Sequence, residues 1–186
     1  MSNPEQSSPD DRITLDAIES ALTDEVVVRQ FAGVTLALLT AGLAFGLVPV
    51  LYGGFSDPNI LDQPSRFAAT TQQHQNGVSR SIYDFGPYLA PLLAAAVAFI
   101  AGFRREGPWR RVLPFVAGGA FVGCLLFVLV STGIGHTQLA VAEGSWGFEE
   151  AIPPYDTAGV LLNGALVGIT GAVGALGGAL VGGIME

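Results

Sequence analysis

Four long stretches of this 186-residue chain contain no Asp, Glu, Arg or His, and they limit its fold more than any other feature. They cover Gln30–Ser56, Phe85–Phe103, Val112–Gly135 and Thr157–Met185, with 27, 19, 24 and 29 residues. A helix needs about 20 mostly apolar residues to cross the hydrocarbon core of a bilayer. The pattern therefore predicts an all-α integral membrane protein with one transmembrane domain, residues 30–186. We expect its four spans near residues 31–52, 87–104, 112–134 and 158–184.

Proline positions and loop lengths agree with the expected boundaries of the four spans. Pro87 and Pro91 fall in the first turn of the second expected span and Pro114 in the first turn of the third. A missing N–H costs little at such positions. The second span would then follow a loop near 53–86, and a loop of this length is typical of function or disorder.

Arginine placement predicts the orientation of the spans. The link between the second and third spans reads FRREGPWRR and contains Arg104, Arg105, Arg110 and Arg111. Short loops rich in Arg stay on the cytoplasmic side. We therefore expect a multi-pass protein of the cell membrane with both termini in the cytoplasm, and with loops near 53–86 and 135–157 outside.

Two further segments precede the first span. Residues 1–12, MSNPEQSSPDDR, are typical of a disordered acidic tail. In residues 13–29, Leu15, Ile18 and Leu22 recur at helical steps, which predicts a short amphipathic helix. We expect this helix to cover the cytoplasmic end of its own bundle, because an apolar stripe of three residues is short for a docking site.

The last span contains GALVGITGAVGALGGALVGG, residues 164–183. Its small residues recur at alternating steps of four and three, at Gly164, Gly168, Gly171, Ala175, Gly178 and Gly182. Bulky residues follow the same rhythm two positions away, which places them about 200° around the helix. A flexible linker would contain polar residues instead, and no GxGxxG motif supports a nucleotide loop. The segment therefore predicts a glycine-zipper helix whose small face packs closely against a neighbour in lipid.

The other spans contain shorter rows of small residues at the same spacing. They are Gly33, Ala37, Ala41 and Ala44 in the first span, Ala90, Ala94, Ala98 and Gly102 in the second, and Gly119 and Gly123 in the third. These rows predict four transmembrane helices packed through Gly/Ala faces. An oligomer packed along the fourth helix is the alternative.

The charged residues have an unusual composition. Sixteen acids and eight basic residues, all of them Arg, give a net charge of −8. This acid-rich composition without Lys resembles that of membrane proteins of halophilic archaea. The resemblance implies solvated acidic surfaces and no particular activity, and GC-rich codon usage would also favour Arg over Lys.

Candidate sites are few. Cys124 is the single cysteine, which excludes an intrachain disulfide or a CxxC metal site. His74 has no further ligand at metal-binding spacing, so we expect no metal and no cofactor. Thr and Ser in the spans are expected to bond to their own helix backbone. Asn163, near the outer end of the fourth span, is the candidate for an interhelical hydrogen bond.

A Tyr-Asp pair precedes both the second and the fourth expected span, at Tyr83-Asp84 and Tyr155-Asp156. We interpret this repetition as chance rather than duplication. Each Asp is expected at a helix N-terminus, where a carboxylate is favourable as a cap and through the helix dipole.

The expected spans contain no ionisable residue at mid-membrane, where pumps, proton-coupled transporters and voltage sensors place charges. The sequence therefore favours a non-catalytic integral membrane protein, an accessory or scaffold subunit whose partners are the bilayer and a second copy or another membrane subunit. The alternative is an oligomeric channel or facilitator with the fourth helix near the pore axis. A membrane enzyme is disfavoured, because HExxH, GxSxG and acidic metal clusters are missing. No nucleic-acid partner is expected.

Overall fold

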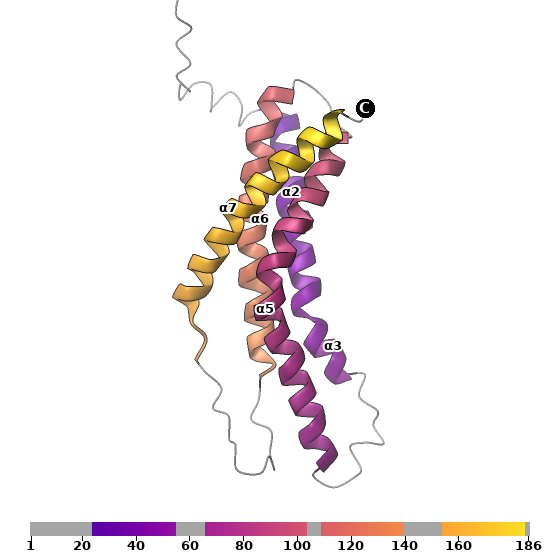
Figure 1. Cartoon of the computed structure of the whole chain (residues 1–186), viewed down its shortest axis with the longest axis vertical. Coiled ribbons are helices and arrows are strands. Elements are labelled where there is room, and N and C mark those ends of the chain that lie inside the picture. Colours follow the sequence, from indigo (N-terminus) through magenta and orange to yellow (C-terminus); the bar gives the residue numbers. More distant parts are fainter. Residues whose placement is uncertain (1–23, 55–65, 104–108, 140–153, 185–186) are drawn as a thin grey trace, which may run out of the picture.

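The computed structural model describes residues 24–54, 66–103, 109–139 and 154–184. Every regular element within these residues is a helix (Figure 1). The helices are α2 (Glu25–Gly46), α3 (Val48–Gly54), α5 (Arg66–Phe103), α6 (Trp109–Thr137) and α7 (Thr157–Ile184). This confirms the predicted all-α class.

Four helical stretches are long and apolar enough to cross a membrane, as the sequence predicted. They are Glu25–Leu51, Asn76–Gly102, Val112–Thr137 and Thr157–Ile184. Several expectations fall outside the described residues: the acidic tail 1–12, residues 13–23 of the expected amphipathic helix, Arg104 and Arg105, and residues 140–153 of the second expected outer loop.

The first span begins at a side-chain cap. The Asp24 carboxylate accepts a hydrogen bond of 3.0 Å from the backbone N–H of Val26, which satisfies one of the free donors at the start of α2. Arg29 and Glu25 form an ion pair of 2.9 Å one turn further on. Residues 25–29 thus belong to the first span helix itself. At the other end, Leu47 separates α2 from α3, because Pro49 has no N–H to continue the helical hydrogen bonds.

The prediction of a loop up to residue 86 was wrong from Arg66 onwards. Helix α5 has 38 residues, and both Pro87 and Pro91 lie in its interior. Ser79, Ile82, Gly86 and Ala90 are buried at helical spacing, so one face of this polar-looking segment packs on the bundle and stabilises the helix. Asp84 consequently lies within α5 and not at a helix N-terminus.

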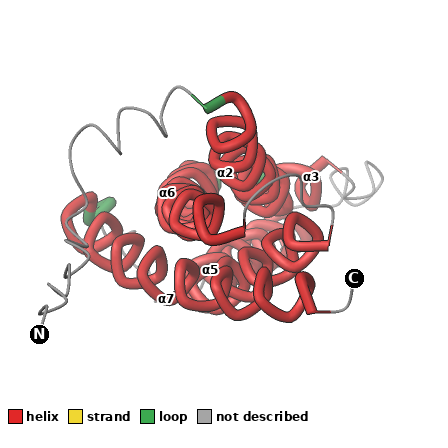
Figure 2. The backbone as a smooth tube through the Cα atoms, turned by 90° about the horizontal axis from the view of Figure 1, so that it is seen from above, coloured by secondary structure: helices red, strands yellow, loops and turns green. Residues whose placement is uncertain are grey.

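The four long helices pack into one bundle with α6 in contact with α2, α5 and α7 (Figure 2). Fully buried side chains of all four helices form the core, among them Leu38, Ala94, Phe127 and Ala175. The rings of Phe45 and Phe127 stack at a centroid distance of 5.8 Å. Helix α7 runs obliquely along the bundle (Figure 1).

The small row expected on the first span was also wrong. Gly33 has no heavy atom within 4 Å of an added Cβ, and Ala37 and Ala44 are exposed. The face that packs on α6 instead contains Val34, Leu38, Gly42 and Gly46. An added Cβ at Gly42 would lie 2.7 Å from the Cα atom of Phe127. The two backbones therefore approach closely one position away from the expected row.

Candidate functional site

The expected small face of α7 lies on the side of the helix that meets α5 and α6. Five of its six positions are buried: Gly164, Gly168, Gly171, Ala175 and Gly182. An added Cβ would lie 2.9 Å from the Phe121 carbonyl oxygen at Gly168, and it would meet the Cys124 sulfur at Gly171. The sixth position, Gly178, is half-buried, and its added Cβ would meet the Ala95 carbonyl oxygen.

The opposite side of α7 exposes large apolar side chains, with Val173 66 % exposed. The other exposed members of this face are Leu162, Leu166, Ile169 and Leu180. Helices α2 and α5 also expose large apolar side chains, such as Leu36 and Leu92. The outside of the bundle is therefore apolar along three of its helices.

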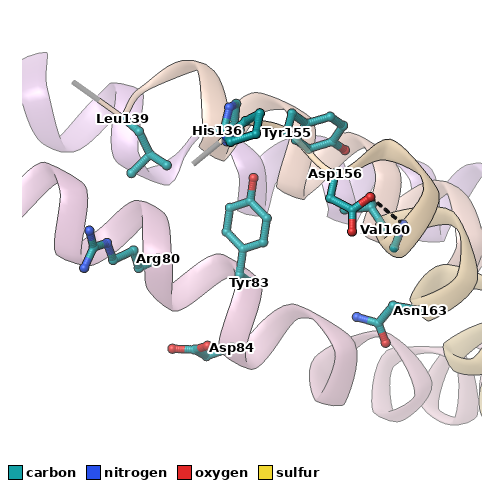
Figure 3. Close-up of a pocket in the computed structure, with 11 residues that line it drawn as sticks. Arg80, Tyr83, Asp84, His136, Leu139, Tyr155, Asp156, Val160 and Asn163 are labelled. Atoms are coloured by element: carbon teal, nitrogen blue, oxygen red, sulfur yellow. Dashed lines mark hydrogen bonds between the residues drawn. The ribbon is translucent and has the colours of Figure 1, made fainter. Parts of the chain in front are cut away.

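A cavity of about 670 Å³, lined by both polar and apolar side chains, lies between α5, α6 and the start of α7. Arg80, Tyr83 and Asp84 line it from α5, and His136 and Leu139 from the end of α6 (Figure 3). The third side is formed by residues before and within the first turns of α7, including Tyr155, Asp156, Val160 and Asn163. This volume lies within the range of about 300–1,000 Å³ that is usual for small-molecule sites.

Three rings meet at this cavity. The His136 ring lies 5.2 Å from the Tyr155 ring and 6.5 Å from the Tyr83 ring, between centroids. The Tyr155 hydroxyl is 3.2 Å from the Thr132 hydroxyl on α6. The Tyr83 hydroxyl is buried and has no hydrogen-bond partner, although it is directed toward His136 and Tyr155 (Figure 3). An unsatisfied buried hydroxyl is costly, so this group needs an explanation.

Asp156 occupies the expected N-cap position of α7. Its carboxylate accepts a hydrogen bond of 3.0 Å from the backbone N–H of Gly159, and its carbonyl accepts one of 2.9 Å from Val160. A side chain at Gly159 would collide with this carboxylate. The glycine therefore allows Asp156 to fold over the first turn, and the prediction of a capping aspartate here is confirmed.

Asn163 lines the cavity with an exposed side chain, and no hydrogen bond joins it to another described residue. An interhelical hydrogen bond is made instead by Thr35, whose hydroxyl donates to the Gly119 carbonyl of α6 at 3.1 Å. Thr40 and Thr170 bond to carbonyls of their own helices, at 2.8 and 3.1 Å, as expected. Thr35 differs because it faces a glycine, which leaves the neighbouring carbonyl accessible.

The arginines, the histidine and the cysteine singled out in the sequence lie on α5 and α6, as far as the structure describes them. Arg110 and Arg111 lie in the first turn of α6, and His74 lies within α5. Cys124 is buried in the core. Within the described ranges, no group of three or more His, Cys, Asp or Glu side chains is arranged to hold a metal ion.

Sequence reasoning missed the cavity but noted a pattern within it. The two Tyr-Asp pairs, Tyr83-Asp84 and Tyr155-Asp156, are 72 positions apart, yet all four residues line the same space. Their repetition was the available signal. His136 and Arg80 had no such signal, because their neighbourhood depends on how α5, α6 and α7 pack.

Comparisons of the chain with protein-family models, with curated proteins and with solved structures gave no match.

Proposed function

We propose that this protein is a non-catalytic, four-span integral membrane protein that acts as an accessory or scaffold subunit. The observation that supports this most is the outer surface of the bundle, where α2, α5 and α7 expose large apolar side chains. Soluble monomers rarely expose large contiguous apolar patches. Hydrocarbon chains or apolar faces of other membrane helices are the natural neighbours of such a surface.

The close approaches between helices support packing through Gly and Ala in this membrane protein. The small face of α7 meets α5 and α6, and the buried Ala90, Ala94 and Ala98 of α5 lie along the bundle core. In lipid, where apolar burial gives little driving force, close van der Waals contact between backbones is a main source of helix association. We therefore propose that this internal fit holds the spans together.

The proposed orientation places the link between α5 and α6 in the cytoplasm, because Arg104, Arg105, Arg110 and Arg111 flank it. The cavity then lies at the outer end of the bundle. A scaffold role is favoured over transport, because the polar groups gather at this end and the core at mid-span consists of Leu38, Ala94, Phe127 and similar apolar residues.

The oligomeric channel remains the alternative. Its support is weaker, because the small face of α7 already meets α5 and α6 within one chain. A pore at α7 would have to use the opposite face, whose exposed residues are Leu, Ile and Val.

Co-purification from native membranes tests this proposal. A photoreactive residue is placed at one outward position of the tagged full-length chain, either Val173 on α7 or Leu92 on α5. The protein is crosslinked in the membrane and then extracted in a mild detergent. We expect one defined membrane protein to be captured at a discrete mass at one of these positions. Phe127, a fully buried position that already holds an aromatic ring, is the control that captures none. Adducts with lipid alone at both positions, together with ion flux in liposomes containing the pure protein, would favour the channel.

A further inference from the structure

We propose that the cavity between α5, α6 and α7 binds a protonated amine, that is, an ammonium group with N–H donors, carried by a soluble small molecule or by a lipid headgroup. The proposal is independent of the accessory role, and only the depth of the site in the membrane rests on the proposed topology.

The lining is rich in hydrogen-bond acceptors. Asp84 and Asp156 contribute carboxylates, and Asn163 contributes an amide carbonyl. One carboxylate oxygen of Asp156 accepts from Gly159, and the other oxygen remains available to a ligand. A ligand that brings N–H donors would satisfy these acceptors.

The formal charge of the lining favours a cation. Two carboxylates, Asp84 and Asp156, and one guanidinium, Arg80, line the cavity, and Arg80 already takes part in an interaction of its own. The aromatic rings add to this preference, because the faces of Tyr rings attract ammonium groups within about 6 Å. An anionic ligand would meet two carboxylates and only one guanidinium.

A bare metal ion fits this lining less well than an amine. Among the described residues, no group of three or more His, Cys, Asp or Glu side chains is placed so that it could hold a metal ion, and hard divalent cations prefer about six oxygen ligands in a compact shell. The volume of about 670 Å³ instead matches a molecule of several heavy atoms.

The proposed topology places the cavity at the level of lipid headgroups. A core of about 30 Å corresponds to about 20 helical residues. Counting from the arginine-rich end, Gly102 on α5 and Val112 on α6, the outer boundary falls near Tyr83 and Ser131. His136 then lies about 7 Å beyond it. Both an amine dissolved outside and an amine-bearing lipid headgroup can reach such a site.

The test uses the full-length protein in two settings. In neutral detergent, ethanolamine is titrated by calorimetry, with choline as the control that has the same charge and no N–H. In lipid nanodiscs of mixed composition, native mass spectrometry measures whether phosphatidylethanolamine is retained over phosphatidylcholine. Binding in the first setting alone identifies a soluble amine, and selective retention in the second identifies a lipid headgroup.

Variants connect either result to the cavity. Asp84→Asn and Asp156→Asn each remove one charge, and Asn still caps α7 as well as Asp does, so folding is retained. We expect each to weaken amine binding by about tenfold or more. The matched control is Glu25→Gln, which removes an exposed carboxylate on α2, outside the cavity lining. It should leave binding unchanged.

Three results would overturn the proposal: no binding of ethanolamine and no selective lipid retention, equal affinity for choline, or binding that Asp84→Asn and Asp156→Asn leave unchanged. Preferential binding of phosphate or sulfate in the same calorimeter would overturn it as well. None of these outcomes bears on crosslinking at Val173 or Leu92, so failure of the amine site and failure of the accessory role are distinguishable.

Discussion

Two adjacent glycines of α7 have opposite surroundings. A Cβ added at Gly178 would meet the Ala95 carbonyl oxygen of α5, whereas one at Gly177 would find open space within 4 Å. The absence of a side chain is therefore required by a neighbouring backbone at one position and by nothing at the next. Composition alone does not distinguish these two residues.

This pair gives a direct test of close packing. We expect Gly178→Leu to destabilise the folded protein by about 1–3 kcal/mol, because the added side chain has to push α5 away. Gly177→Leu should change stability by less than about 0.5 kcal/mol. Thermal unfolding in detergent, followed by circular dichroism, measures both. Equal losses for the two variants would show that helix propensity or lipid contact matters rather than the fit to Ala95.

The two tyrosines of the cavity differ in whether the hydroxyl has a hydrogen-bond partner. The Tyr155 hydroxyl has a partner in Thr132, and the Tyr83 hydroxyl has none. Without ligand, Tyr155→Phe should cost about 0.5–1.5 kcal/mol, whereas Tyr83→Phe should be neutral or stabilising, because it removes an unsatisfied buried group. Denaturant unfolding of the amine-free protein distinguishes the two. A clear loss for Tyr83→Phe would mean that its hydroxyl has a partner in the free protein.

At the scale of elements, the extent of a helix depends on what it packs against. The sequence was sufficient for the four apolar spans, because hydropathy and length act locally. It was insufficient for residues 66–86 of α5, whose Gln, Ser and Asn residues resemble a loop. In the part of this segment from Ser79 onwards, Ser79, Ile82 and Gly86 are buried against the bundle. This contact stabilises the helix, and no local pattern reports it. The interior position of Pro87 follows from the same cause.

The prediction of the packing face of α2 was wrong for a related reason. Leu38 packs on Gly123 of α6, where an added Cβ would lie 2.7 Å from the Leu38 side chain. A large residue therefore fills the space above a glycine of the partner helix. Pairing of small residues with small residues was the expectation. For α7 the expected row and the contacting side coincide, because nearly every position there is either small or bulky.

The N-terminus of α7 depends on one carboxylate. Asp156→Ala removes the cap to Gly159 and should destabilise the protein by about 0.5–2 kcal/mol. Asp156→Asn should retain most of this stability, since Asn caps as well as Asp. Hydrogen exchange of the backbone amides of residues 157–160 reports the same difference locally. If both variants lose stability equally, the charge of Asp156 matters more than its hydrogen bond.

At the scale of the whole molecule, the sequence predicts the orientation of the helices across the membrane. The packing of the helices alone carries no information on that orientation. The apolar outer surfaces of α2, α5 and α7 do not distinguish one side of a membrane from the other, so the asymmetry lies in the segments between the helices. Two arginines, Arg104 and Arg105, lie between α5 and α6, and Arg110 and Arg111 follow in the first turn of α6. The stretch between α6 and α7 has no arginine and contains Glu143, Glu149 and Glu150. This difference is the basis of our proposal that the link lies in the cytoplasm and the acidic stretch outside.

Single-cysteine labelling tests this orientation, and the chain is suited to it because Cys124 is its single cysteine and is buried. In intact cells, a membrane-impermeant maleimide should label Ser145→Cys, between α6 and α7, and should leave Gly107→Cys, between α5 and α6, unmodified until the membrane is opened. The unchanged protein, in which Cys124 alone is present, is the control and should stay unlabelled in both conditions. Labelling of Gly107→Cys in intact cells would reverse the topology and move the cavity to the cytoplasmic end. Replacing the four arginines in and directly after that link with Gln should weaken the preference, because the retention of basic residues in the cytoplasm is what fixes it.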